Sequence, residues 1–306
     1  MESQPHKPEW FSNEEVLVVN APTCGINKDG DVQFKVSIDG TRSSDIIDDE
    51  LNKTVEDLSK NDIKKLKYAQ YISIKEIIDS KIWVPQYHDK FFKNSLSKIF
   101  DKSSFRIITI NDLFKQGKIS ILKGHGSPSS DQRIGEIPYI KVSDIRAGQV
   151  NINPTNRIPL ELARGFWKAD NSGLQAYDLI SPERASKNIG EFSVLMPGQE
   201  NIVLTKEVII IRSNVSNAEF DQFYLIWALS LLVVREQWGR CILMQTNRED
   251  IGNRYLEIEL PIPRNKKTAD SVSKDFKDYY EAQALTRAKL QIALEQSPYK
   301  HSFYLS

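Results

Sequence analysis

Residues 135–150 read GEIPYIKVSDIRAGQV, a run of strand-forming residues that closes on polar side chains and a glycine. Its β-branched and aromatic residues suit a pleated, half-buried surface, so we expect a strand here. Ser143, Asp144 and Arg146 follow at the end of that strand. We expect Asp144 to brace the turn that follows it, and Gly148 to end the strand and let the chain leave it.

The sequence on either side of this run has the same character, with short strand-like segments separated by turn residues. We predict strands over 139–142, 193–196, 202–212 and 256–263. An apolar segment, 221–238, predicts one long buried helix, and 246–250 predicts a short polar helix start. The pattern indicates a mixed α+β fold with a twisted sheet and a buried helix.

The two ends of the chain differ from this central part. Residues 16–40 predict a strand and a hairpin that turns at 28–31, and a helix is expected from about Asp49. A single long helix is expected after Pro263, with a narrow apolar stripe typical of packing on another helix. We therefore divide the chain into four parts: a hairpin and helix at 1–65, a basic connecting segment at 66–104, the mixed domain at 105–263 and a C-terminal helix at 264–306.

Composition limits the classes of protein to which the chain can belong. The 306 residues carry 41 basic and 41 acidic side chains, so a whole-surface polyanion binder is disfavoured and any nucleic-acid surface must be local. The two cysteines, Cys24 and Cys241, show no metal or disulfide spacing, which fits a reducing, cytoplasmic setting. The N-terminus lacks a signal pattern, and the longest apolar run, 223–234, is too short to span a bilayer, so no membrane association is expected.

Motifs for catalysis are weak or missing in the sequence. Asp62 with Asp79 and Lys81 matches the letters of an acidic metal nuclease, but these residues fall in predicted helix or loop. The sequence has no G-x-S-x-G, G-x-G-x-x-G or G-x-x-x-x-G-K-[ST], and its four histidines lack metal-ligand spacing. His125 lies in the glycine- and serine-rich segment 124–130, which we expect to be a flexible loop. We expect no catalysis by this chain alone, no cofactor and no bound metal.

Residues 105–263 resemble the target recognition domains of type I restriction-modification specificity subunits and of related adenine methyltransferases. The resemblance rests on the order and spacing of seven stretches. They are KISILKGHGSPSSD (118–131), GEIPYIKVSDIRAGQV (135–150), GLQAYDLISPERASKNIGEFSVL (173–195), IVLTKEVIIIRS (202–213), YLIWALSLLVVREQWGR (224–240), QTNREDIG (245–252) and YLEIELPIP (255–263). The resemblance implies sequence-specific recognition of double-stranded DNA, with delivery of an adenine-N6 methylase, and possibly a nuclease, to the target.

A second resemblance covers residues 18–51, VVNAPTCGINKDGDVQFKVSIDGTRSSDIIDDEL, which look like the end of an N6-adenine DNA methylase domain. The catalytic body of such an enzyme is missing from the sequence. Two alternatives to a separate, non-catalytic specificity subunit therefore stay open. The chain could be the C-terminal specificity portion of a fused S-adenosylmethionine-dependent methyltransferase, or a protein-interaction scaffold.

The resemblance implies loops that enter the major groove, where phosphate contacts position the protein and base contacts specify the sequence. For phosphate we select cationic side chains in or beside loops: Lys123, Arg133, Arg157 and Lys187. For base reading we select Lys141, Ser143, Arg146, Arg184, Ser186, Asn188, Thr246, Asn247 and Arg248. The plainer interpretations are solvated surface charge for the cations and a helix N-cap for the Thr246–Asn247 pair.

Two further expectations concern packing and partners. Phe166 and Trp167 could stack on bases, but an aromatic pair packed beneath a loop is the more common arrangement. The C-terminal helix resembles the spacer helices of the family, which dock onto methylase subunits. Because the chain holds one recognition domain, pairing of two chains through this helix would present two half-sites, so we expect a homodimer as a possible assembly.

Overall fold

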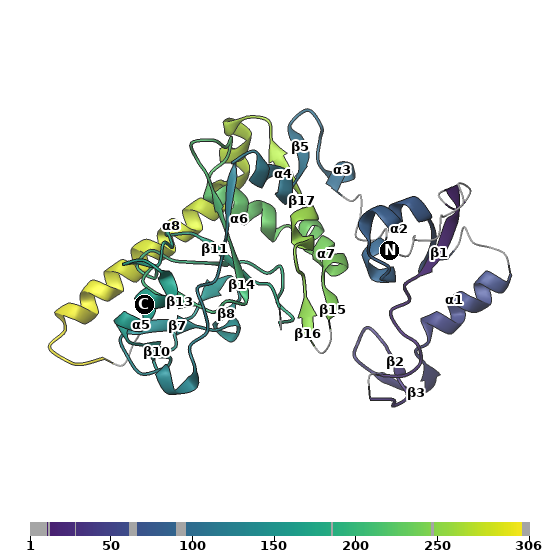
Figure 1. Ribbon diagram of the computed structural model, residues 1–306, viewed down its shortest axis with the longest axis horizontal. Helices are drawn as coiled ribbons and strands as arrows, with labels where there is room; N and C mark the ends of the chain where they lie inside the picture. Colours follow the sequence, from purple (N-terminus) through teal and green to yellow (C-terminus); the bar gives the residue numbers. More distant parts are fainter. Residues whose placement is uncertain are drawn as a thin grey trace, which may run out of the picture. The chain divides into compact units, whose positions relative to one another are not determined.

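The computed structural model divides into two compact units, Met1–Lys93 and Asn94–Ser306, and Figure 1 shows the elements of each. The structure describes residues 11, 13–27, 29–60, 66–89, 96–184, 186–245 and 248–301. The model has helices and several small mixed sheets, so the predicted mixed α+β class is confirmed.

The first unit is built around a two-stranded antiparallel sheet. Strand β1 (Glu15–Val19) pairs with β4 (Ala69–Ser73), and helix α2 (Ile74–Ser80) follows β4 directly, with Ser73 as its N-cap. Strand β4 was not predicted. It lies within the segment 66–104 and is hydrogen-bonded to the N-terminal part of the chain. After α2 comes the short helix η3 (Pro85–His88), which has a proline in its first turn.

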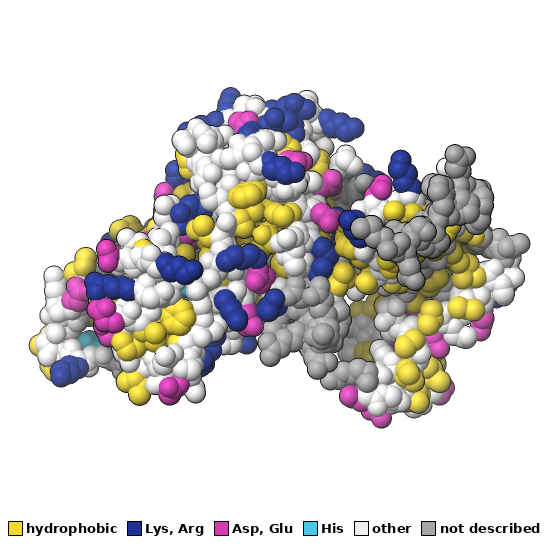
Figure 2. Space-filling model, in the orientation of Figure 1, with side chains coloured by type: hydrophobic (Ala, Val, Ile, Leu, Met, Phe, Trp, Pro, Cys, Tyr) yellow, Lys and Arg dark blue, Asp and Glu magenta, His cyan; other side chains and the backbone are white. Residues whose placement is uncertain are grey.

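The predicted helix of this unit is confirmed, whereas the hairpin predicted to turn at 28–31 is reduced to an isolated bridge. An isolated bridge joins Ile26 to Val32 across the turn, where Gly30 takes a positive φ of 88°. Lys28 lies outside the described residues. Strands β2 (Phe34–Val36) and β3 (Arg42–Ile47) pair next, and Asp49 caps helix α1 (Glu50–Ser59) by accepting the N–H of Asn52. Figure 2 shows apolar side chains exposed over β2 and β3.

The larger unit is centred on a six-stranded mixed sheet. Its pairs are antiparallel except for the parallel pair of β9 with β12. The strand order is β6 (Ile119–Lys123), β14 (Val208–Ser213), β11 (Leu179–Pro182), β12 (Ser193–Val194), β9 (Gln149–Val150) and β8 (Ile145–Arg146).

A second sheet carries the beginning of the 135–150 stretch. Strand β7 (Ile137–Ile140) lies between β10 (Arg157–Ile158) and β13 (Val203–Leu204), and helix α5 (Leu160–Trp167) contacts β13. The prediction that Phe166 and Trp167 pack beneath a loop is confirmed. The indole N–H of Trp167 donates to the Ile202 carbonyl at 3.0 Å, and a Cβ at Gly126 would lie 2.2 Å from the Phe166 ring.

Two strand predictions are wrong in detail. The predicted strand 202–212 is two strands, β13 and β14, which belong to different sheets. Strand β7 ends at Ile140, two residues earlier than predicted, because the chain turns into the 3-10 helix η6 (Val142–Asp144). Another short 3-10 helix, η5 (Ser130–Gln132), precedes β7.

The single buried helix predicted over 221–238 is also wrong. Two helices occupy this segment, α6 (Gln222–Ser230) and α7 (Leu232–Cys241), because Leu231 takes an extended ψ of 130° between them. Helix α6 is almost entirely buried, as predicted. Leu232, predicted to lie in the core, is 72% exposed because it starts the second helix.

The strands at the two ends of residues 105–263 pair with each other. Strand β5 (Phe105–Thr109) is antiparallel to β17 (Glu259–Pro263), as Figure 1 shows. Helix α3 (Leu96–Ile99) contacts β17 and α4 (Ile110–Lys115) contacts β5, while the short helix η7 (Arg254–Glu257) contacts α4. Where a polar helix start was predicted at 246–250, a hairpin of β15 (Leu243–Gln245) and β16 (Arg248–Asp250) is found instead.

The predicted long C-terminal helix is confirmed as α8 (Lys266–Gln296), the yellow helix of Figure 1. Its first half packs on α6 and the main core through Val272, Phe276, Tyr280 and Ala284. Further along the helix, Leu285 and Ile292 are exposed. The helix therefore packs on another helix as predicted, but only along part of its length.

Candidate nucleic-acid interface

The segment 141–146 is shaped by Asp144. Its carboxylate Oδ2 accepts the backbone N–H of Lys141 at 2.8 Å, and its carbonyl accepts the backbone N–H of Asn151 at 2.9 Å and the side-chain amide at 3.1 Å. Asp144 therefore braces a turn, as expected, although it is the turn that precedes it. Ser143 and Arg146 are left exposed on either side of this bracing residue.

The chain leaves strand β8 at the turn that contains Gly148, as expected, but it stays in the same sheet. Ala147 and Gly148 both take positive φ values, 51° and 72°, and the chain reverses so that β9 pairs with β8. This tight reversal fixes Arg146 at the last position of β8, next to the turn. In place of the single predicted strand, the chain forms strand β7, the 3-10 helix η6 and a hairpin whose strands β8 and β9 have two residues each.

A second loop follows β11 and closes on itself. The hydroxyl oxygen of Ser186 accepts the backbone N–H of Asn188 at 3.0 Å, and the Asn188 carbonyl accepts the N–H of Glu191 at 2.9 Å. Lys187 is exposed at the tip of this loop. Gly190, at the end of the loop, has a φ of 80°, and a Cβ there would lie 2.4 Å from the Trp238 ring.

The two loops line one pocket of about 420 Å³. Its lining residues are Val142, Ser143, Arg146, Ser186, Lys187 and Asn188. Five of these were selected from the sequence as DNA contacts. Their side chains supply two cations, two hydroxyls and one amide, which are the groups that suit phosphate oxygens and base edges. Figure 2 shows Lys and Arg side chains, with a few carboxylates between them, on the face where Figure 1 draws β8 and β14.

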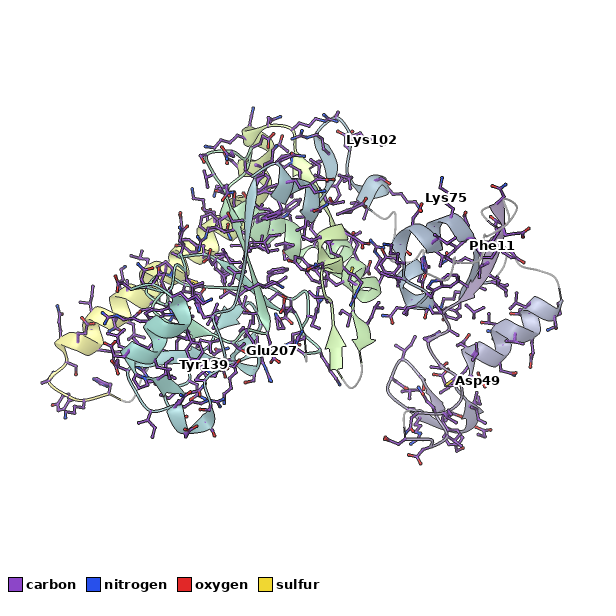
Figure 3. All side chains as sticks on the ribbon, viewed as in Figure 1. Phe11, Asp49, Lys75, Lys102, Tyr139 and Glu207 are labelled. Carbon is purple, nitrogen blue, oxygen red and sulfur yellow. The ribbon has the colours of Figure 1, made fainter. Side chains whose placement is uncertain are left out.

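Three of the predicted phosphate contacts are engaged within the protein. Lys123, at the end of β6, forms an ion pair with Glu183. Arg133 donates to the Pro128 carbonyl at 2.9 Å and lies over the ring of Tyr139, which Figure 3 labels. Arg157 donates to the Glu136 carbonyl at 2.8 Å. These three side chains hold loops and strands together, so phosphate binding would compete with their present contacts.

The remaining selected residues do not line the pocket. Lys141 is half-buried at the start of the braced turn, and Arg184 is exposed just beyond β11. Thr246 and Asn247 lie outside the described residues. Arg248 is the first residue of β16, so the N-cap interpretation of this segment is wrong, because the chain continues as a strand.

Hydrogen bonds hold the His125 side chain in place, so the expectation that it lies in a flexible loop is wrong. Its Nδ1 accepts the N–H of Leu204 at 3.0 Å, so its Nε2 carries the proton donated to the Ser172 carbonyl at 2.9 Å. Burial lowers the pKa of His125, and the hydrogen bond to Ser172 opposes this shift. Gly124 beside it packs so closely that a Cβ would lie 1.7 Å from the Thr205 carbonyl oxygen.

Metal-binding and membrane-spanning features are missing from the described part of the chain. No group of three His, Cys, Asp or Glu side chains there could hold a metal ion. No described helix is both long and apolar enough to cross a membrane. Of the cysteines, Cys24 is exposed and Cys241 is buried, and burial raises the pKa of the Cys241 thiol to about 12.

One residue of this site was missed from the sequence. Glu191 accepts the backbone N–H of Ala147 at 3.1 Å and so connects the two loops of the pocket. The two residues are 44 positions apart, and no local pattern marks a carboxylate that accepts a backbone N–H so far along the chain.

No protein-family model and no curated protein matches the sequence. Among solved structures, the chain is similar to a type I restriction-modification S subunit from M. genitalium, at 13% identity and a TM-score of 0.41, over 64% of this chain and 45% of that one. It is also similar to the HsdS subunit of Thermoanaerobacter tengcongensis, at 12% identity and a TM-score of 0.38, over 86% of this chain and 60% of that one.

A third similar structure is the type IIG restriction endonuclease BpuSI, at 10% identity and a TM-score of 0.46. The match covers 76% of this chain and 33% of that enzyme. The chain thus spans between a third and about three fifths of the length of these three proteins.

Proposed function

We propose that this chain is a sequence-specific double-stranded DNA recognition module of a restriction-modification system, which directs an adenine-N6 methylase to its target. The observation that supports this most is the pocket between the loops 142–146 and 186–188. Arg146 and Lys187 supply positive charge from the two loops. Ser143, Ser186 and Asn188 supply the hydroxyl and amide groups that pair with base edges in the major groove.

Selection from a library of duplexes with a random core tests this function with the full chain. We expect one class of sequences to be enriched. The logarithm of the binding constant should fall linearly with the logarithm of the salt concentration, because lysine and arginine side chains that bind phosphates release counterions from the DNA. A chain that enriches no sequence, with or without a methylase partner, contradicts the proposal and favours a protein-interaction scaffold.

The recognition module supplies no methyl transfer of its own in this proposal. Purified chain incubated with duplex DNA and S-adenosylmethionine is expected to leave the DNA unmethylated. Methylation by the chain alone would contradict the proposal that the chain is non-catalytic. The matched control is the same assay with a methylase subunit added.

A second candidate, the specificity portion of a fused methyltransferase, is favoured by the first unit. Strands β2 and β3 and the turn between them expose Val36, Ile38, Ile46 and Ile47. A two-stranded hairpin is only marginally stable without a covering surface. A methylase body would cover these side chains. The reading frame next to this one distinguishes the candidates, because a methylase body that continues into this chain indicates a fused enzyme.

The same proposal extends to assembly through α8. Leu285 and Ile292 lie seven residues apart, on one face of the helix, and both are exposed. Pairing of two chains along this face would bury them and present two recognition pockets to two half-sites.

A further inference from the structure

Glu191 connects the two loops that line the proposed DNA-reading pocket. Its Oε1 accepts the backbone N–H of Ala147 at 3.1 Å, while its own N–H donates to the Asn188 carbonyl at 2.9 Å. One residue therefore holds the 186–191 loop through its backbone and the 146–148 turn through its side chain.

The turn at Ala147 needs such a partner. Ala147 has a φ of 51°, a left-handed conformation that L residues other than glycine, asparagine and aspartate seldom adopt. Behind the turn lies a cavity of about 290 Å³, lined in part by Gly148, Gly190 and Tyr280. Because that side is not filled, packing alone does not hold the turn. The Gly148 carbonyl, which accepts the N–H of Val194 at 3.0 Å, is its other anchor.

The loop that carries Glu191 is held in place from α7. The guanidinium of Arg235 donates to the Ile189 carbonyl, and a Cβ at Gly190 would lie 2.6 Å from Arg235 Nη1. Burial lowers the pKa of Arg235, and the negative charge of Glu191 opposes this lowering, so the two side chains interact. The 186–191 loop therefore rests on a helix of the core.

We infer that Glu191 is a positioning residue for DNA reading: it clamps the Ala147 turn to the 186–191 loop and so holds Arg146 at a fixed place across the pocket from Lys187 and Asn188. The inference rests on the proposed function, because a clamp for reading has meaning only if the pocket reads DNA. It assigns a role in specificity to a carboxylate that need not touch DNA.

Two variants test the clamp. E191A removes the acceptor, whereas E191Q keeps an oxygen that can accept the Ala147 N–H and serves as the conservative rescue. In duplex selection with the full chain, E191A is expected to reduce the base preference about tenfold at one position, the same position at which R146A relaxes the preference. This loss is similar in size to the loss of one bidentate contact with a base. The salt slope stays unchanged, because no phosphate contact is removed. E281A, at an exposed glutamate on α8, is the matched control and keeps the wild-type preference.

Amide hydrogen exchange of the free protein gives a readout that does not depend on DNA. The Ala147 amide is expected to lose protection in E191A and to keep it in E191Q. Unchanged protection of Ala147 in E191A overturns the clamp, whatever the DNA result. Lost protection with an unchanged base preference overturns the role in reading. If the wild type selects no sequence, the proposed function fails, and the role in reading fails with it, while exchange still reports whether the clamp exists.

Discussion

At the residue scale, Arg146 and Lys187 differ in how firmly the backbone around them is held. Arg146 is fixed beside a tight turn, which suits a side chain that must meet one base edge in one geometry. Lys187 is exposed at a loop tip, which suits a point charge that meets any phosphate.

We expect R146A to weaken binding to the preferred duplex by about 1–3 kcal/mol and to relax selectivity at one base position. K187A should instead weaken binding to all duplexes alike and lower the salt slope by about 1. Selection and salt titration of both variants measure this. Uniform weakening by R146A would assign that residue to phosphate.

Arg212, which was not selected as a DNA contact, is paired with a buried carboxylate. Arg212 makes a two-pronged contact to Asp178, at 2.7 and 2.6 Å, and Asp178 is 1% exposed. We expect R212M to destabilise the protein by about 3–5 kcal/mol, because it leaves a buried carboxylate without its counter-charge.

Chemical denaturation measures this cost, and K274M is the matched control. Lys274 pairs with Asp278 on the exposed side of α8, where solvent screens the pair, so losing it should change the free energy of unfolding far less than losing Arg212. Equal costs for the two variants would show that the Asp178 site tolerates an unpaired charge.

His125 makes stability depend on pH. Its folded-state pKa is lowered by burial, so the unfolded chain binds the proton more readily. The stability that neutral His125 contributes is therefore present above its usual pKa of about 6.5, and is lost as pH falls from there toward the lowered pKa.

We expect the free energy of unfolding to fall between pH 7.5 and pH 5, and part of this fall to disappear in H125Q. The wild-type dependence should persist in H301Q, because His301 is exposed. Denaturation at a series of pH values tests this. An H125Q curve parallel to the wild-type curve would remove His125 as a source of the pH dependence.

At the element scale, the break between α6 and α7 changes which apolar residues matter. Leu229 is 2% exposed in α6, whereas Leu232 is exposed at the start of α7. We expect L229A to destabilise by about 2–5 kcal/mol, through lost burial and the cavity left behind. L232A should stay within about 0.5 kcal/mol of wild type, as is usual for surface positions. A large cost for L232A would indicate one continuous buried helix, as the sequence predicted.

Elements set by local signals were predictable, and those set by distant pairing were not. The Asp49 cap of α1 and the narrow apolar stripe of α8 are local features of the sequence, and both helices were predicted. Residues 202–212 read as one strand because strand propensity is continuous there. Which sheet each half joins depends on β7 and β6, which are more than 60 residues away in sequence.

The candidate site follows the same division. Ser143, Arg146, Ser186, Lys187 and Asn188 were found because loops rich in polar residues and the family resemblance mark them. Lys123 was selected by the same criteria, but its partner Glu183 lies 60 residues away in sequence, so its engagement was not predictable. Glu191 was missed for that reason too.

At the scale of the whole molecule, α8 exposes more large apolar side chains than any other helix or strand in the described part of the second unit. Its first half is covered by α6 and the core, whereas Leu285 and Ile292 are exposed. In a homodimer, each of these side chains would be buried, and fully burying a leucine or isoleucine contributes about 1.5–3 kcal/mol.

We expect the wild-type chain to dimerise in a concentration-dependent manner, and the double variant L285E/I292E to be monomeric, because two charges would have to enter an apolar seam. Sedimentation velocity over a range of concentrations measures both. T286E/A293E is the matched control: it adds two negative charges, also seven residues apart and at exposed positions of α8, about a quarter turn round the helix from Leu285 and Ile292. A wild-type chain that stays monomeric at high concentration would remove the homodimer, and Leu285 and Ile292 would then be assigned to a different partner. A dimer that persists in L285E/I292E would place the interface on another surface.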